Sequence, residues 1–106
     1  MENMRAVLLY EVNPHEIGID TLQQFDHELR SIYARLDTNA ILKAFLRNVD
    51  VIIAAIEDAK IGINLAIDLQ NMRQTYENRK RLYREYKNIA NALSYAIDCL
   101  QTFSPH

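Results

Sequence analysis

The histidines and carboxylates of this chain are the residue types that could support acid–base or metal chemistry. They cluster as His15-Glu16 and as Asp26-His27-Glu28. A metal-binding helix needs ligands three or four residues apart, because that spacing places two side chains on one face. Neither stretch has a His–His or Glu–His pair at that separation. We therefore expect surface residues beside an apolar stripe, with no metal centre and no cofactor.

The single cysteine and the serines do not suggest a nucleophilic site. Cys99 lies between Ile97 and Leu100, and no Lys, Arg or His is near it in the sequence to stabilise a thiolate. The serines lack the neighbouring glycines of an exposed nucleophile turn, and Gly18 and Gly62 are too far apart to form a phosphate-binding loop. We expect Cys99 to be a buried structural thiol and the protein not to be an enzyme.

The stretch YENRKRLYREYK, residues 76–87, combines cations with tyrosines. Residues 73–87 contain six Lys and Arg and two Glu, whereas residues 1–72 contain six basic and eleven acidic residues. Exposed tyrosines could stack on bases while the cations bind phosphates, as in proteins that bind single-stranded nucleic acid. A net charge of −2 for the whole chain disfavours that function.

A second interpretation places the tyrosines of this stretch in the interior. Tyr76, Tyr83 and Tyr86 continue a helical stripe of apolar residues, so we expect them to pack inward while the cations form a solvated face. Arg79 falls on the same stripe, where a guanidinium is costly unless a carboxylate or a tyrosine ring meets it. We expect Arg79 to fix the register of a seam with the acidic N-terminal half of this chain or of a second copy.

The composition is that of one small globular domain spanning residues 1–106. Apolar residues make up 49% and charged residues 25%, and only two Gly and two Pro are available for tight turns. The early apolar run, Ala6 to Tyr10, is too short for a signal peptide, and no window resembles a membrane span. With a single cysteine, these features predict a cytoplasmic protein that does not enter a membrane.

Hydrophobic spacing predicts helices near residues 20–37 and 39–61. The first rests on apolar residues spaced three and four apart, namely Leu22, Phe25, Leu29, Ile32 and Leu36. The second rests on Leu42, Phe45, Val49, Ile52, Ile56, Ala59 and Ile63. Gly62 could end this helix, and Asn64 could cap the next one. Residues 61–69 also alternate as in a strand, but the helical spacing on both sides favours a helix.

The third predicted helix covers residues 64–102. Its stripe is Leu65, Leu69, Met72, Tyr76, Arg79, Tyr83, Tyr86, Ala90, Leu93, Ile97 and Leu100. A continuous helix over the roughly 36 residues of this stripe would be about 54 Å long, and its excess length would have to meet another chain, a ligand or water. A break near Glu77-Asn78 would give four helices instead. Residues 4–12 fit a short helix or a strand, and we favour the helix.

These patterns predict an all-α antiparallel helical bundle and a non-enzymatic protein–protein interaction module. We expect an adaptor, regulator or assembly subunit that self-associates through the C-terminal helix. The expected partner-binding residues are Arg73, Tyr76, Arg79, Lys80, Tyr83, Arg84 and Lys87. The alternative function is a nucleic-acid-associated regulator that binds phosphates through the cations at 73, 80, 84 and 87.

Overall fold

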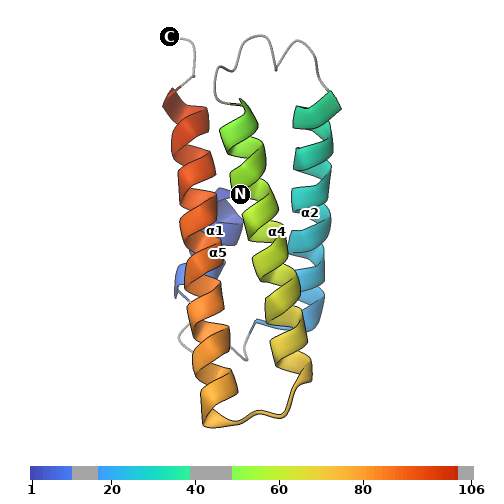
Figure 1. The fold of residues 1–106 in the computed structure, drawn as a ribbon, viewed down its shortest axis with the longest axis vertical. Helices are drawn as coiled ribbons and strands as arrows, with labels where there is room; N and C mark the ends of the chain where they lie inside the picture. The colour runs from blue at the N-terminus through green and yellow to red at the C-terminus, as the bar shows by residue number, and fades with distance from the viewer. Residues whose placement is uncertain (11–16, 39–48, 103–106) are drawn as a thin grey trace.

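The computed structural model of this protein describes residues 1–10, 17–38 and 49–102. Within these residues the chain forms four α-helices and no strand: α1 (Glu2–Tyr10), α2 (Ile19–Thr38), α4 (Val49–Asn71) and α5 (Tyr76–Thr102). Figure 1 shows α4 between α2 and α5, with α1 packed against α5. The molecule measures 47 × 23 × 18 Å along its principal axes. The predicted all-α antiparallel helical bundle is confirmed; one of the four helices in the described residues is the short N-terminal element.

The helix α2 matches its prediction to within one residue at each end. Its buried residues are Leu22, Phe25, Leu29 and Leu36. The backbone amide of Leu22 donates to the carbonyl of Gly18 at 3.1 Å, and Asp20 lies in the first turn, where a carboxylate stabilises the helix dipole. The ambiguous N-terminal segment is helical from Glu2 to Tyr10; the rest of the predicted element, residues 11–12, lies outside the described residues.

The predicted helix end at Gly62 is wrong, because α4 continues through it to Asn71. Gly62 is buried, and a Cβ built on it would lie only 2.5 Å from Cγ1 of Ile89 on α5. The missing side chain therefore allows a close approach of two helices rather than a left-handed turn. Asn64 does not cap a helix; its amide nitrogen donates to the carbonyl of Lys60 within α4, at 2.9 Å. Residues 61–69 are helical and do not form the strand that their alternation would allow. Residues 39–48 of the second predicted helix lie outside the described residues.

The continuous helix predicted for residues 64–102 is also wrong, because the chain reverses between Asn71 and Tyr76. Thr75 ends this connection as an N-cap: its hydroxyl accepts the backbone amide of Asn78 at 3.2 Å. The side chain of Asn78 returns to donate to the carbonyl of Arg73 at 2.8 Å. Gln74 donates to the carbonyls of Gln70 and Met72. Side chains thus satisfy backbone groups on both sides of the turn, which lies just before the break considered at residues 77–78.

The reversal folds α5 back along α4, so this hairpin covers itself and leaves no overlong helix. A buried polar contact also ties the hairpin to the segment before α2. The side-chain amide of Gln70 donates to the hydroxyl of Tyr86 at 2.7 Å and to the carbonyl of Ile17 at 2.5 Å. Tyr86 is only 2% exposed, and burial raises the pKa of its phenol while the bond from Gln70 lowers it. Self-association therefore needs a basis other than excess helix length.

Candidate interaction surfaces

All of the predicted partner-binding residues are exposed, in the connection before α5 and along its first half. They are Arg73, Tyr76, Arg79, Lys80, Tyr83, Arg84 and Lys87. The prediction that Tyr76 and Tyr83 face inward is wrong, since they are 73% and 40% exposed, and Arg79 is exposed as well. The third predicted ring, Tyr86, does face inward and is 2% exposed. From there the predicted stripe is buried through Ala90, Leu93 and Ile97, beside the parallel line of Leu82, Ile89 and Ala96.

The exposed tyrosines pair with lysines one turn further along α5. The ammonium of Lys80 lies 5.1 Å from the ring centroid of Tyr76, and that of Lys87 lies 4.9 Å from the ring centroid of Tyr83. Both distances are within the range of cation–π attraction. Spacings of four, three and four residues place these side chains on one line of the helix. We call Tyr76, Lys80, Tyr83 and Lys87 the tyrosine–lysine strip.

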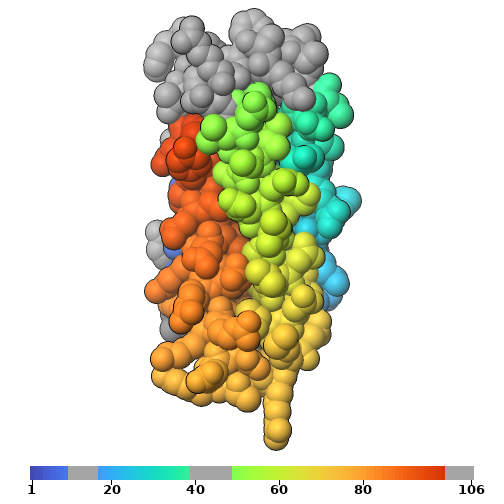
Figure 2. Space-filling view, viewed as in Figure 1, coloured from blue at the N-terminus to red at the C-terminus, as the bar shows by residue number. Residues whose placement is uncertain are grey.

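A second surface, which the sequence did not predict, lies on α4. Figure 2 shows α4 uncovered between α2 and α5 on this side of the molecule. The large exposed apolar residues here are Val51, Ile61 and Leu65 of α4, and Met72 directly after its end; Ile61 is 58% exposed and Leu65 is 47% exposed. Their spacing of ten, four and seven residues keeps them near one face of the helix. We call these four residues the α4 apolar face.

Hollows flank the α4 apolar face on both sides. Between α4 and α5 lies an open groove of about 500 Å³, lined by Val51, Ala54, Ala55, Asp58, Glu85, Asn88, Asn91, Ala92 and Tyr95. Nearer the turn, Leu65 and Met72 share a smaller hollow with Arg81 and Arg84. Toward α2, Ile61 and Leu65 border a third hollow. The α4 apolar face is therefore a ridge between depressions, a shape that another helix could fit.

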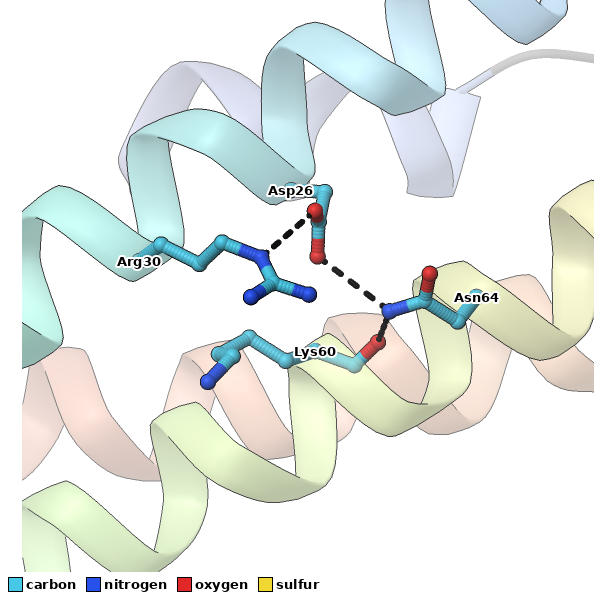
Figure 3. A network of polar contacts seen from close by, with 4 residues as sticks. All are labelled: Asp26, Arg30, Lys60 and Asn64. Carbon is cyan, nitrogen blue, oxygen red and sulfur yellow. Dashed lines mark hydrogen bonds and ion pairs between the residues drawn. The ribbon is translucent and has the colours of Figure 1, made fainter.

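Polar side chains join α2 to α4 beside this ridge (Figure 3). The carboxylate of Asp26 accepts from Nε of Arg30 at 2.8 Å and from the amide nitrogen of Asn64 at 3.2 Å. The ammonium of Lys60 lies 4.7 Å from the ring centroid of Tyr33 on α2. Arg30–Asp26 is the single ion pair recorded between described residues, and it lies on the surface. These contacts hold α2 and α4 together. The Arg and Lys side chains of α5 have no ion-pair partner among the described residues.

The described histidine and cysteine lie apart from each other, on α2 and α5. His27 is exposed on α2, and His15 and His106 lie outside the described residues. No group of three or more His, Cys, Asp or Glu side chains is arranged there to hold a metal ion. Cys99 is partly buried and packs against the core, rather than being fully buried as expected.

Comparisons with known proteins give no family, curated relative or solved structure that matches this chain. None of the described helices combines the length and apolar character needed to cross a membrane. The tyrosine–lysine strip and the α4 apolar face are the features of the described residues that bear on function.

Proposed function

We propose that this protein is a non-enzymatic protein–protein interaction module that self-associates through the α4 apolar face. The observation that carries the proposal is the exposure of Ile61 and Leu65 on a helix that is otherwise packed on both sides. Isolated exposed apolar residues are common on proteins, but a line of them bounded by polar residues marks an interaction site. An adaptor, regulator or assembly subunit would work through such a face.

The size of this side of the molecule suits a stable interface. Its long and intermediate axes are 47 and 23 Å, an outline that exceeds the ~800 Å² buried per partner in an interface of standard size. Removing an apolar side chain from water contributes about 25 cal/mol per Å² of buried apolar surface. The half-exposed side chains of the α4 apolar face would therefore add favourable binding free energy when a second copy packs against them and removes their surface from water.

Charge selects a second copy in antiparallel orientation as the occupant. Arg81 and Arg84 border the α4 apolar face near the turn, beside Asp68 and Glu85, and the further cations of residues 73–87 leave this end net positive. Asp50 and Asp58 lie in the first half of α4. A two-fold axis across the middle of α4 brings the basic end of one copy over the acidic end of the other. A parallel pair would place the four arginines together, which repels them. The same rotation sets Val51 of one copy opposite Met72 of its partner.

Size-exclusion chromatography with light scattering tests this proposal directly. The wild-type chain should elute with the mass of a dimer, and Leu65→Glu should elute as a monomer because it buries a carboxylate in the interface. Leu9→Glu is the matched control, since Leu9 is equally exposed, at 47%, but lies on α1. The charge swap Arg84→Asp should weaken the dimer, and adding Asp58→Arg should restore it. A monomeric wild type, or a dimer that survives Leu65→Glu, contradicts the proposal.

A further inference from the structure

We infer that the tyrosine–lysine strip is a binding site for single-stranded nucleic acid, a function separate from self-association through α4. The strip follows a line of α5 different from the one that borders the α4 groove, which passes through Glu85, Asn88, Ala92 and Tyr95. An antiparallel dimer built on α4 therefore leaves the strip open. Each copy would present one strip at its basic end.

The outward tyrosine rings favour nucleic acid over an acidic protein. Tyr76 and Tyr83 do not pack into the interior, and part of their ring surface is open to solvent. Every base has a π-face, so exposed rings can stack on any single-stranded sequence. An acidic peptide would be attracted mainly by the cations, whereas consecutive bases can stack on rings that are about 10 Å apart along the helix.

The cations are arranged to bind phosphates on either side of the rings. Arg79 lies between Tyr76 and Tyr83 in the helical order, three residues after one and four before the other. Lys80 and Lys87 lie on the strip itself, and Arg84 directly follows Tyr83. Among the described residues none of these four forms an ion pair. Lys80 and Lys87 contact the tyrosine rings but are exposed, so a phosphate can reach them, whereas Arg84 also borders the α4 apolar face. Glu85 lies off the strip, beside residues of α4.

The rest of the molecule limits the ligand to a short segment. Residues 1–72 have an excess of acidic over basic side chains, so a polyanion is attracted to the basic end of the hairpin alone. Four neutralised phosphates on a single strand give a logarithmic salt slope of about −3. Affinity should therefore fall about fifty-fold between roughly 50 and 200 mM salt.

Fluorescence anisotropy of the full chain with labelled oligothymidylate of about 15 nucleotides tests this inference. The wild type should bind with the salt dependence given above, and a duplex of the same length should bind more weakly. Tyr76→Ala with Tyr83→Ala should weaken binding about tenfold or more for each ring, whereas Phe at both positions should retain it. Circular dichroism shows whether the variants keep their helices.

A matched arginine pair isolates the position of the charge. Arg79→Gln should reduce affinity several-fold and make the salt slope shallower by about 0.7, because one phosphate contact is lost. Arg35→Gln, which removes the same charge from the exposed face of α2, should change neither. The inference is overturned if the oligonucleotide does not bind at low salt. It is equally overturned if the double alanine variant binds as well as wild type, or if polyglutamate competes as effectively as unlabelled oligonucleotide.

Discussion

The interface between α4 and α5 contains two stretches that use small residues in opposite ways. At Gly62 the helices approach until Ile89 occupies the space a Cβ would need. Nearer the start of α4, Ala54 and Ala55 line a groove of about 500 Å³ together with Ala92 of α5, and it stays open among the described residues. The same kind of residue thus closes the interface in one stretch and opens it in the other.

The difference is set by the residue opposite. Ile89 is a large side chain, 1% exposed, and it packs into the notch left by Gly62. Ala92 has no such bulk, so alanines on both helices leave a surface groove flanked by Val51 and Tyr95. A small residue allows close packing only when a large partner fills the gap. The tight stretch should therefore control stability, and the open stretch should tolerate larger side chains.

The largest expected effect comes from removing the large partner. Ile89→Ala should lower the free energy of unfolding by about 2–5 kcal/mol, because it deletes buried methylene groups and leaves a cavity beside Gly62. Urea unfolding followed by circular dichroism measures the change. Ile61→Ala makes the same chemical substitution at an exposed position, and should cost less than about 0.5 kcal/mol in dilute monomer. Equal losses at the two positions would show that the tight stretch has no special role.

Enlarging the small partner should have the next largest effect. Gly62→Ala gains about 1 kcal/mol of helix propensity but forces Ile89 to move, which typically costs about 1–3 kcal/mol. We expect a net loss of up to about 2 kcal/mol in the wild-type background. In an Ile89→Ala background the closest neighbour left is the Glu85 carboxylate at 3.0 Å, the end of a flexible side chain, so the same change should become stabilising. A double-mutant cycle measures this reversal, and additivity of the two changes would contradict the close-approach explanation.

The sequence predicted α2 and the second half of α5 because their apolar residues keep one phase without interruption. It failed at Gly62, because local patterns reveal that a glycine can turn but not that Ile89, 27 positions later, needs its space. The turn at residues 72–75 was missed although a signal exists. Thr75 precedes a helix with Glu77 in its first turn and Asn78 three residues on, a combination typical of a helix start.

The two exposed surfaces also differ in how far the sequence predicted them. Composition alone placed cations and tyrosines at residues 73–87, and these residues are exposed. Tyr86 was correctly predicted to be buried, whereas Tyr76 and Tyr83 on the same predicted line are exposed near the turn, a difference that residue spacing alone does not give. The α4 apolar face was not predicted, since a second apolar line on a helix also fits burial on two sides. Only the positions of α2 and α5 show which line of α4 stays uncovered.

Filling the open stretch should produce a smaller change of opposite sign. Ala54→Leu adds apolar volume at the groove beside α5, where helix propensities of the two residues are nearly equal. We expect the free energy of unfolding to rise by up to about 1 kcal/mol as the new side chain covers apolar surface. Urea unfolding compares it with Gly62→Ala, another enlargement on the same helix. A loss as large as that of Gly62→Ala would show that the groove is not open to filling.

The smallest expected effect concerns the polar contact near the turn, and it appears only at alkaline pH. Burial raises the pKa of Tyr86 above its ordinary value of 10.0, so the native state holds the phenolic proton more tightly than the unfolded chain. Stability from this group is fully present below pH 10. It falls as pH rises through the native pKa, by at most about 1.4 kcal/mol per pH unit.

Tyr86→Phe removes the hydrogen bond from Gln70, so its free energy of unfolding at neutral pH should be about 1 kcal/mol lower than that of the wild type. The variant should also lack the loss of stability at alkaline pH that this phenol causes. Urea unfolding of both proteins from neutral pH to above pH 10 should therefore show their difference shrinking as pH rises. Tyr95→Phe changes an exposed phenol on the same helix and retains the decline due to Tyr86. A wild-type stability that stays parallel to that of Tyr86→Phe across this range would mean that the buried contact does not discriminate between the protonated and ionised phenol. Tyr86 would then stabilise this end of the hairpin through packing and its hydrogen bond, with no contribution that depends on pH.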